Sequence, residues 1–276
     1  MSATAAVVLA GGRSTRMGTP KAQLEWHGST LLRRAVGIVG RAVDGPVVVV
    51  TAPGQRLPEL PAGVEVAEDA REGRGPLEGI AAGLAAIGER APVVYVTGID
   101  APFLHPAFVR RVLALLGPDA DVALPCAHGF PQPLAAAYRT TVATPLRALL
   151  SQDGQLSTGA LLRHCRVTEL DEAMLLADAD VAAFDPALDS LLNLNDPREY
   201  EAARRRPPPA VSVARGDGSA PLAIRAATLA AAAAAARVRL GDGVLATVNG
   251  RPADDPQEPL VAGDVVLLRR GSSSHI

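Results

Sequence analysis

Apolar runs and amphipathic stretches alternate along the first two hundred residues. Short apolar runs, rich in Val and Ala, predict strands at 7–9, 46–51, 64–67, 92–97, 120–124 and 134–138. Apolar residues at helical spacing predict helices at 30–43, 77–88, 106–116 and 141–150. The continuous β-branched run at 47–50 is typical of a strand covered on both faces. This alternation predicts an α/β fold with a layered, mostly parallel sheet.

The pattern changes where three arginines precede three prolines, at 204–209. The prolines predict a stiff, extended linker at 206–210 between a domain at 1–205 and a second domain at 211–276. We interpret the arginines as solvated charge at the end of a helix. Beyond the linker, the pattern predicts a small α+β domain. Its elements are strands at 210–214 and 222–225, a helix at 226–236, and strands at 244–248 and 264–268.

Composition narrows the class of protein. The 276 residues are 48% hydrophobic and carry a net charge of −2 without a long basic run, which disfavours nucleic-acid binding. The apolar stretch at 226–236 is about half the length of a membrane helix, so we expect no membrane partner and a cytoplasmic protein. Cys126 and Cys165 have no metal-ligand spacing, and we expect two buried thiols in a reducing compartment. His27, His105, His164 and His275 show no zinc-ligand spacing.

Glycine and then positive charge follow the first predicted strand. Gly11 and Gly12 come first, and Arg13, Arg16 and Lys21 follow within nine positions. Glycine lets the main chain approach an anion, oriented N–H groups bind it, and cations neutralise its charge. The segment therefore predicts a polyphosphate site. Its glycine spacing matches neither a Walker loop nor a dinucleotide-binding loop.

This segment resembles the signature loop of the nucleotidyltransferases that share the sugar-nucleotide pyrophosphorylase fold, and among them the molybdenum cofactor guanylyltransferases. The matching residues are Leu9, Ala10, Gly11, Gly12, Ser14, Arg16, Met17, Gly18 and Lys21. The resemblance covers residues 5–205 and implies a Rossmann-like, three-layer nucleotidyltransferase domain. It implies that Leu9, Ala10, Gly11, Gly12 and Lys21 bind the nucleotide, and that Arg16 and Lys21 are catalytic cations.

Asp100 directly follows the apolar strand predicted at 92–97. A carboxylate just past the end of a buried strand can hold Mg²⁺ against substrate phosphates. Asp100 and Pro102 match the family's Cys-Asp-x-Pro, with Ile99 in place of the cysteine. We therefore expect Asp100 to be the catalytic metal ligand and Mg²⁺ the cofactor. The alternative is an aspartate that begins a turn before proline.

Two segments resemble the family's nucleoside-binding residues. Gly75-Pro76-Leu77-Glu78-Gly79 matches Gly-Pro-Leu-x-Gly, which implies that Pro76, Leu77 and Gly79 lie against the base and ribose. Asp69 matches an acidic position near guanine, where a carboxylate accepts hydrogen bonds from the N1–H and 2-amino groups. Glu68 is the alternative for that role.

Two further segments are candidates for binding the second substrate. Asn193 and Asn195 match the family's Asn-x-Asn-x-Pro and fall on one side of an extended segment, so both can face the metal, the phosphates or the pterin. Alternatively, Asn195 or Asp196 caps the helix that Pro197 begins. The stretch from 128 to 134 resembles a family loop, in which we expect Gln132, or His128, to contact the pterin.

The predicted elements beyond the linker follow the order of a small, ubiquitin-like β-grasp fold. The sequences at 247–250 and 260–266 resemble the sulfur-carrier subunit of molybdopterin synthase. Such carriers end in Gly-Gly, whereas this sequence ends in Ser272-Ser273-Ser274-His275-Ile276, so sulfur transfer is not implied. Docking to a cofactor-synthesis protein or an apoenzyme, or simple stabilisation, stay open as roles.

The resemblance as a whole implies Mg²⁺-dependent transfer of GMP from GTP to molybdopterin, with release of pyrophosphate. Three alternatives stay open: cytidylyl transfer to the same pterin, a sugar-phosphate or other small-phosphate nucleotidyltransferase, and a carrier protein with a degenerate enzyme domain. Gly11 and residues 75–79 favour guanine. The presence of Arg16, Lys21 and Asp100 speaks against degeneracy.

Overall fold

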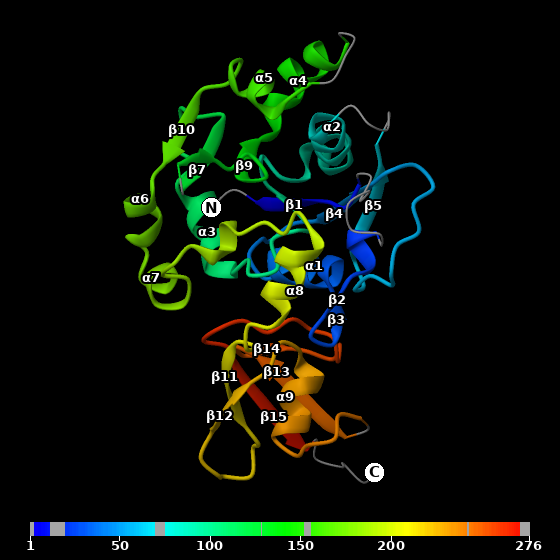
Figure 1. Cartoon of the computed structure of the whole chain (residues 1–276), viewed down its shortest axis with the longest axis vertical. Coiled ribbons are helices and arrows are strands. Elements are labelled where there is room, and N and C mark those ends of the chain that lie inside the picture. Colours follow the sequence, from blue (N-terminus) through cyan, green and yellow to red (C-terminus); the bar gives the residue numbers. More distant parts are fainter. Residues whose placement is uncertain are drawn as a thin grey trace.

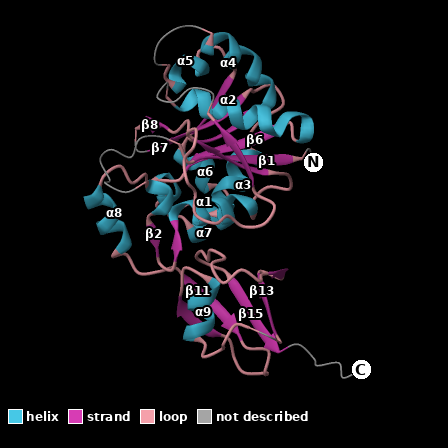
Figure 2. Ribbon diagram, turned by 90° about the vertical axis from the view of Figure 1, so that its right-hand side faces the viewer, coloured by secondary structure: helices cyan, strands magenta, loops and turns pink. Residues whose placement is uncertain are grey.

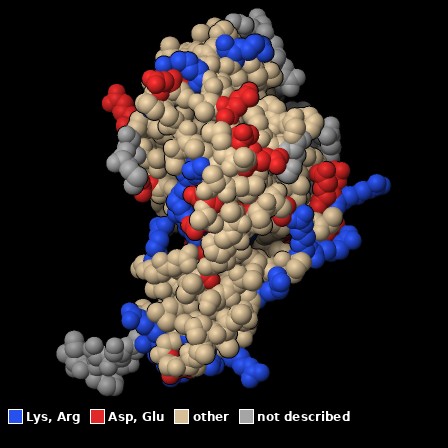
Figure 3. All heavy atoms as spheres, turned by 90° about the vertical axis from the view of Figure 1, so that its left-hand side faces the viewer, with Lys and Arg blue, Asp and Glu red and all other residues tan. Residues whose placement is uncertain are grey.

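A large α/β body and a smaller sheet at its lower end make up the molecule (Figures 1 and 2). The computed structural model describes residues 3–11, 20–69, 75–127, 129–151, 156–241 and 243–270. The two parts meet at a narrow region, around which Lys and Arg side chains lie next to Asp and Glu side chains (Figure 3). Side chains of the two parts contact each other directly across this region.

The large body is organised around one sheet with the strand order β10-β7-β9-β6-β1-β4-β5. Its strands are β1 (Thr4–Leu9), β4 (Val47–Thr51), β5 (Glu65–Glu68), β6 (Val93–Gly98), β7 (Val122–Ala127), β9 (Ala135–Arg139) and β10 (Val167–Leu170), with the short β8 (Phe130–Pro131) paired to β7. Strand β1 is parallel to both β4 and β6, and β4 is parallel to β5. The carboxyl ends of these four strands therefore lie at one edge of the sheet.

Two strands depart from parallel pairing. The short β8 is antiparallel to β7, and β9 is antiparallel to both of its neighbours, β6 and β7. Only residues 128–134 separate β7 from β9, which is too short for a parallel crossover connection. The prediction of a mostly parallel sheet is confirmed, with these two reversals.

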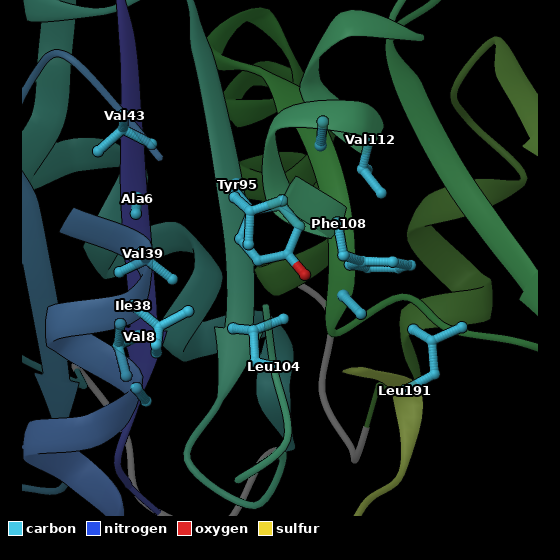
Figure 4. Close-up of a cluster of buried hydrophobic side chains, with 14 of the residues drawn as sticks. Ala6, Val8, Ile38, Val39, Val43, Tyr95, Leu104, Phe108, Val112 and Leu191 are labelled. Atoms are coloured by element: carbon cyan, nitrogen blue, oxygen red, sulfur yellow. The ribbon is translucent and has the colours of Figure 1, made fainter. Parts of the chain in front are cut away.

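Helices cover both faces of the sheet. Four correspond to the predicted ones: α1 (Leu31–Gly40), α2 (Pro76–Ile87), α3 (Pro106–Ala114) and α4 (Ala143–Leu150). Strand residues alternate between two hydrophobic clusters, so that Ala6 and Val8 face α1 and α3 while Ala5 and Val7 face α2 and α4. Tyr95 lies close to Phe108 in the first cluster (Figure 4).

Several short elements were not predicted from the hydrophobic pattern. Helix α8 (Pro197–Arg204) is not among them, because a helix from Pro197 to the arginines was expected. The unpredicted elements are a small hairpin of β2 (Glu25–Trp26) and β3 (Ser29–Thr30), the helices α5 (Thr158–Leu162), α6 (Glu172–Leu176) and α7 (Ala179–Phe184), and the 3₁₀ turns η1 (Lys21–Gln23), η2 (Gly88–Arg90), η3 (Thr140–Val142) and η4 (Asp189–Leu191). Most are five residues or fewer, too short for a clear periodic signal.

The smaller sheet has the strand order β12-β11-β15-β13-β14. Its elements are β11 (Ala210–Ala214), β12 (Leu222–Arg225), α9 (Leu229–Ala235), β13 (Val244–Val248), β14 (Arg251–Pro252) and β15 (Val265–Arg270). The first and last strands, β11 and β15, pair in parallel, and the other pairs are antiparallel. Helix α9 packs on the sheet over its own hydrophobic cluster. The predicted elements of this segment are confirmed, and β14 is added.

The arginines before the proline run are not merely solvated charge. Arg204 forms an ion pair with Glu25, and Arg206 forms one with Asp189 at 2.8 Å. The Arg206 guanidinium also lies 4.6 Å from the centre of the Phe103 ring. Arg205 and Arg206 are exposed, so the arginines are solvated charge as expected, and two of them also form ion pairs at the surface.

The structure bears on two features expected from the composition, the state of the cysteines and the lengths of the apolar helices. Cys126 and Cys165 are both unpaired, but they are half-buried rather than fully buried. Within the described ranges, none of the helices is long and apolar enough to cross a membrane.

Candidate nucleotide and metal site

The predicted site residues gather at the edge where β1, β4, β5 and β6 end. Ala10 and Gly11 follow β1, Asp69 follows β5, and Asp100 comes two residues after β6. The N–H groups of Ala10 and Gly11 donate to the Val50 carbonyl oxygen at 2.8 and 3.1 Å. The Gly11 N–H is therefore already used within the protein, and the expectation that it is a free donor for phosphate needs correction.

Gly11 instead contributes space beside an acidic side chain. A Cβ atom at Gly11 would lie 3.2 Å from Asp69 Oδ2, and one at Gly79 would lie 3.1 Å from Asp69 Oδ1. The Asp69 carboxylate thus lies between the end of β1 and the first turns of α2. The absence of side chains at both glycines lets the carboxylate lie close to the main chain of both segments.

Asp69 has an unusual environment for an acid. Its Oδ1 atom is buried and has no hydrogen-bond partner among the described residues. Burial, with a smaller contribution from the negative charge of Glu78, raises the pKa of Asp69 to about 6. The carboxylate therefore offers an unused acceptor to a ligand that carries hydrogen-bond donors. Its neighbour Glu68 is exposed and accepts from the Gly54 N–H at 3.2 Å.

Gln55 was not predicted and fixes the loops at this edge. Its Nε2 atom donates to the Ala10 carbonyl at 3.0 Å, and its Oε1 atom accepts from the Ala52 N–H at 3.2 Å. One side chain thereby joins the loop after β1 to the loop after β4. A lone glutamine in a loop after a strand is the only sequence signal, and it is too general to single this residue out.

Lys21, Asp100 and the segment around Leu194 come together on the other side of β1. The Lys21 ammonium lies 3.2 Å from Asp100 Oδ2 and donates to the Leu194 carbonyl oxygen at 2.7 Å. The Leu194 N–H in turn donates to the Asp100 carbonyl oxygen at 2.8 Å. Three motifs separated by 79 and 173 residues along the chain thus share one cluster of contacts.

The oxygen atoms around the Lys21 ammonium are of the kind that bind a hard cation. A carboxylate oxygen of Asp100 and the Leu194 carbonyl oxygen both face the same positive charge. Mg²⁺ prefers such oxygen ligands and is typically held by one or two carboxylates together with substrate phosphates. Among the described residues, no group of three or more His, Cys, Asp or Glu side chains could hold a metal by itself. Asp100 is therefore suited to a metal that arrives with a phosphate ligand.

The two asparagines are exposed on either side of the buried Leu194, as side-chain alternation predicts. Asn195 Nδ2 makes a long contact of 3.4 Å with the Asn193 carbonyl oxygen, and the Asn195 N–H donates to Glu199. Asp196 caps α8 by accepting from the N–H groups of Arg198 and Glu199. Asp196 thus takes the capping role, and both asparagine side chains stay at the surface, on either side of the residue whose main chain contacts Asp100.

The remaining predicted residues have different positions. Leu77 is fully buried in the cluster under α2, so its side chain packs in the core and does not face a ligand. Leu9 is half-buried beside the same cluster, and Pro76 is half-buried at the first position of α2. Gln132 follows β8, and its N–H donates to the Pro125 carbonyl of β7 at 2.8 Å. Gly12, Arg16 and His128 lie outside the described residues.

Comparison with known proteins identifies similar sequences over most of the chain. Residues 6–173 match the family model of the MobA-like NTP transferase domain. A probable molybdenum cofactor guanylyltransferase of Bacillus anthracis is 32% identical over 207 residues, and one of Bacillus mycoides is 33% identical over the same length. Each alignment covers 74% of this chain and 98% of the relative.

Solved structures show the same fold at lower sequence identity. Molybdopterin-guanine dinucleotide biosynthesis protein A from Archaeoglobus fulgidus superimposes with a TM-score of 0.56 at 23% identity, over 72% of this chain and 96% of that one. A 2-C-methyl-D-erythritol 4-phosphate cytidylyltransferase from Thermus thermophilus gives a TM-score of 0.51 at 19% identity, over 74% and 98%. These similarities establish the α/β nucleotidyltransferase fold of the large body.

Proposed function

This chain belongs to the MobA-like NTP transferase domain family, and from that membership we propose that it transfers GMP from GTP to molybdopterin or its metal-loaded form. In the proposed reaction, the terminal phosphate of the pterin attacks the α-phosphorus of GTP. The new phosphoanhydride bond forms as the bond to pyrophosphate breaks. The products are the guanine dinucleotide cofactor and pyrophosphate.

The observation that carries this proposal is the meeting of Lys21, Asp100 and the Leu194 carbonyl at the carboxyl edge of the sheet. Ligands of open α/β sheets bind at this edge. The second feature of the site, Asp69 beside Gly11 and Gly79, lies at the same edge next to β1. A nucleoside triphosphate held by both features would place its base near Asp69 and its phosphates near Lys21.

Each residue has a distinct role in the proposal. Lys21, together with Arg16 from the same motif, neutralises the triphosphate and positions its α-phosphorus for in-line attack. Asp100 would hold Mg²⁺, and Mg²⁺ bound there would offset the charge that develops on the phosphate oxygens. Asn193, Asn195 and Gln132 bind the pterin substrate. No protein nucleophile is required, because the attacking phosphate is already an anion at neutral pH.

The environment of Asp69 favours guanine over cytosine. Its Oδ1 atom is an unused acceptor, and the Watson–Crick edge of guanine offers two neighbouring donors, N1–H and the 2-amino group. Cytosine presents one donor and two acceptors on that edge, so an ionised Asp69 would repel its carbonyl oxygen. Cytidylyl transfer to the same pterin is the second candidate.

We also propose that residues 211–270 form a separate β-grasp domain, joined through a linker at 206–210 to a catalytic domain at 1–205. The strand order, with parallel first and last strands at the centre, and a helix packed on one face support this proposal. In this proposal the protein acts in the cytoplasm, and a cofactor-synthesis protein or an apoenzyme is a possible protein partner.

Pyrophosphate release by the full-length protein, supplied with molybdopterin and Mg²⁺, tests the proposed reaction. We expect release with GTP and little with CTP. Asp100→Ala should abolish release while the protein stays folded, and Lys21→Ala should lower turnover more than it weakens GTP binding. Asp121→Ala is a matched control, because Asp121 precedes β7 at the opposite edge of the sheet. Faster release with CTP, or normal turnover by Asp100→Ala, would contradict the proposal.

A further inference from the structure

Two arginines of helix α1, and Arg41 directly after it, contact the segment between α9 and β15. Arg33 forms an ion pair with Asp255, and Arg41 donates to both carboxylate oxygens of Asp264. Arg34 makes a different kind of contact, since its partners on both sides are backbone carbonyls. Arg33 and Arg34 are almost equally buried, at 7% and 6% exposure, which makes them comparable neighbours.

Arg34 joins the two parts of the molecule through one guanidinium group. Its Nε atom donates to the Pro102 carbonyl at 2.5 Å, and its Nη1 atom donates to the Leu260 carbonyl at 3.2 Å. It forms no ion pair with a carboxylate in the part of the chain that the structure describes. Burial lowers the pKa of Arg34 to about 10, so the side chain is still a cation at neutral pH.

The Pro102 carbonyl belongs to the loop that presents Asp100. On one side of this loop, the Asp100 carbonyl accepts from Leu194 N–H at 2.8 Å. On the other side, two residues further along, Arg34 holds Pro102. A buried guanidinium that donates to the main chain restricts where this loop can lie, because its fork geometry is rigid.

The Leu260 carbonyl is itself held in a tight turn of the smaller part. Asp264 accepts from the Val261 N–H at 2.8 Å and from Asn249 Nδ2 at 2.8 Å, in addition to its contacts with Arg41. The Ala262 carbonyl of the same turn lies 3.1 Å from His105 Nε2. The loop from 100 to 105 therefore contacts this turn through Arg34 and also directly through His105.

We infer that Arg34 is a positioning residue that fixes the Asp100 loop against the turn at 260–264, so that the smaller part of the molecule is a component of the catalytic site. The inference rests on the proposed role of Asp100 as the metal ligand. The inference gives the smaller part of the molecule a function in the active site that does not depend on any carrier activity.

Arg34→Lys and Arg33→Lys, each in the full-length protein, separate positioning from general stabilisation. A lysine keeps the charge, but its single ammonium cannot span the two carbonyls that Arg34 joins. Two readouts are needed: amide hydrogen exchange at 103–105, and the affinity for Mn²⁺ with the α,β-methylene analogue of GTP, measured by water proton relaxation.

We expect Arg34→Lys to speed exchange at 103–105 and to weaken the Mn²⁺ complex by about 10- to 100-fold, as for other residues that orient a metal ligand. Arg33→Lys should change neither, because its partners are Glu59 and Asp255. Equal effects of the two variants would overturn the inference, as would faster exchange in Arg34→Lys with unchanged Mn²⁺ binding.

Asp264→Asn keeps the test decisive if Arg34→Lys does not fold. It disturbs the turn at 260–264 without touching the Asp100 loop, and we expect it to weaken the Mn²⁺ complex in the same direction. Wild-type affinity in Asp264→Asn would count against the inference. If the wild-type protein itself forms no Mn²⁺–nucleotide complex, the proposed function fails, while exchange at 103–105 still decides whether Arg34 holds the loop.

Discussion

At the residue scale, Asp69 combines a partly buried carboxylate with an unsatisfied acceptor at the predicted base site. Its pKa is raised to about 6 from 3.8, so the folded state favours the protonated form. Ionisation of Asp69 therefore destabilises the folded protein. This destabilisation is fully present above about pH 6, and it is lost as the pH falls from there to below the unfolded value of 3.8. A buried acceptor without a partner is usually explained by a function, and guanine binding is such a function.

Asp69→Asn should weaken GTP binding by about 10-fold or more, because it removes a charged acceptor. It should strengthen CTP binding, because it removes the negative charge that repels the cytosine carbonyl oxygen. For the wild type, GTP affinity should fall as the pH drops through about 6, where Asp69 becomes protonated, and Asp69→Asn should flatten this dependence. Calorimetric titrations with GTP and with CTP between about pH 5 and about pH 8, a range that spans the raised pKa of Asp69, measure all three effects. Glu68→Gln is the control, and a larger loss of GTP binding there would transfer the role to Glu68.

Asp69→Asn should weaken GTP binding but stabilise the folded protein. Asp69→Asn should raise the free energy of unfolding at neutral pH by about 1 kcal/mol, since partial exposure screens the full cost of ionising the acid. The difference should shrink as the pH falls from about 6 towards the unfolded value of 3.8, and it should vanish below that value, where Asp69 is protonated in both states. Urea denaturation across this range checks the prediction, and a gain that grows towards acid pH would contradict it.

At the element scale, long and strongly patterned segments were predictable, and short ones were not. Buried strands such as 47–51 and the long helices α1 to α4 carry a clear periodic signal. Because parallel strands end at one edge, the loop after β1 and Asp100 after β6 were expected to share one site. The family resemblance, not the strand pattern, implied that Asn193 and Asn195 face it. The reversal of β9 depends on the length of its connection, and α5 to α7 are too short to recognise.

Other features of the site depend on tertiary contacts that no local pattern encodes. Arginines on a helix indicate a solvated face, yet Arg33 and Arg34 are buried against partners more than two hundred residues away. Gln55 acts through two backbone groups that only the fold brings together. Leu77 matched a binding motif but is a core residue, because a helix that lines a site must also pack on its sheet.

Helix α1 offers a matched pair of glycines for testing its contact with the smaller part. A Cβ atom at Gly37 would lie 2.5 Å from the Pro259 ring, whereas one at Gly40 would meet only Val47 at 3.8 Å. Gly37→Ala should therefore lower the free energy of unfolding by about 1 to 3 kcal/mol through overpacking. Gly40→Ala should raise it by about 0.4 to 1 kcal/mol by restricting the unfolded chain. Equal effects in chemical denaturation would show that α1 and Pro259 are not in close contact.

At the scale of the whole molecule, buried charged groups join the two parts. The Arg41–Asp264 pair is 13% and 3% exposed at its side chains, and Asp264 also orders the turn that carries the Leu260 carbonyl. Such a pair adds little net stability over an apolar replacement, but it enforces one arrangement of the two parts. That rigidity is what the inferred role of Arg34 requires.

Arg41→Met should destabilise the protein by about 3 kcal/mol, because it leaves the Asp264 carboxylate buried without its main cationic partner. The double variant Arg41→Met with Asp264→Asn should recover part of this loss, since the unpaired charge is then removed. Urea denaturation of Arg41→Met, Asp264→Asn and the double variant measures these differences. If the double variant loses as much as the two single variants added together, the pair does not act as a unit.

The central claim is that Lys21, Asp100 and Asp69 bind different parts of one nucleotide. A crystal structure of the protein with Mn²⁺ and the α,β-methylene analogue of GTP tests it most directly, because the anomalous signal of Mn²⁺ locates the metal independently of the refined coordinates. The account predicts an anomalous peak that joins the Asp100 carboxylate to the phosphates, and guanine hydrogen-bonded to Asp69. A metal bound away from Asp100, or a guanine base in a separate cleft, would contradict it.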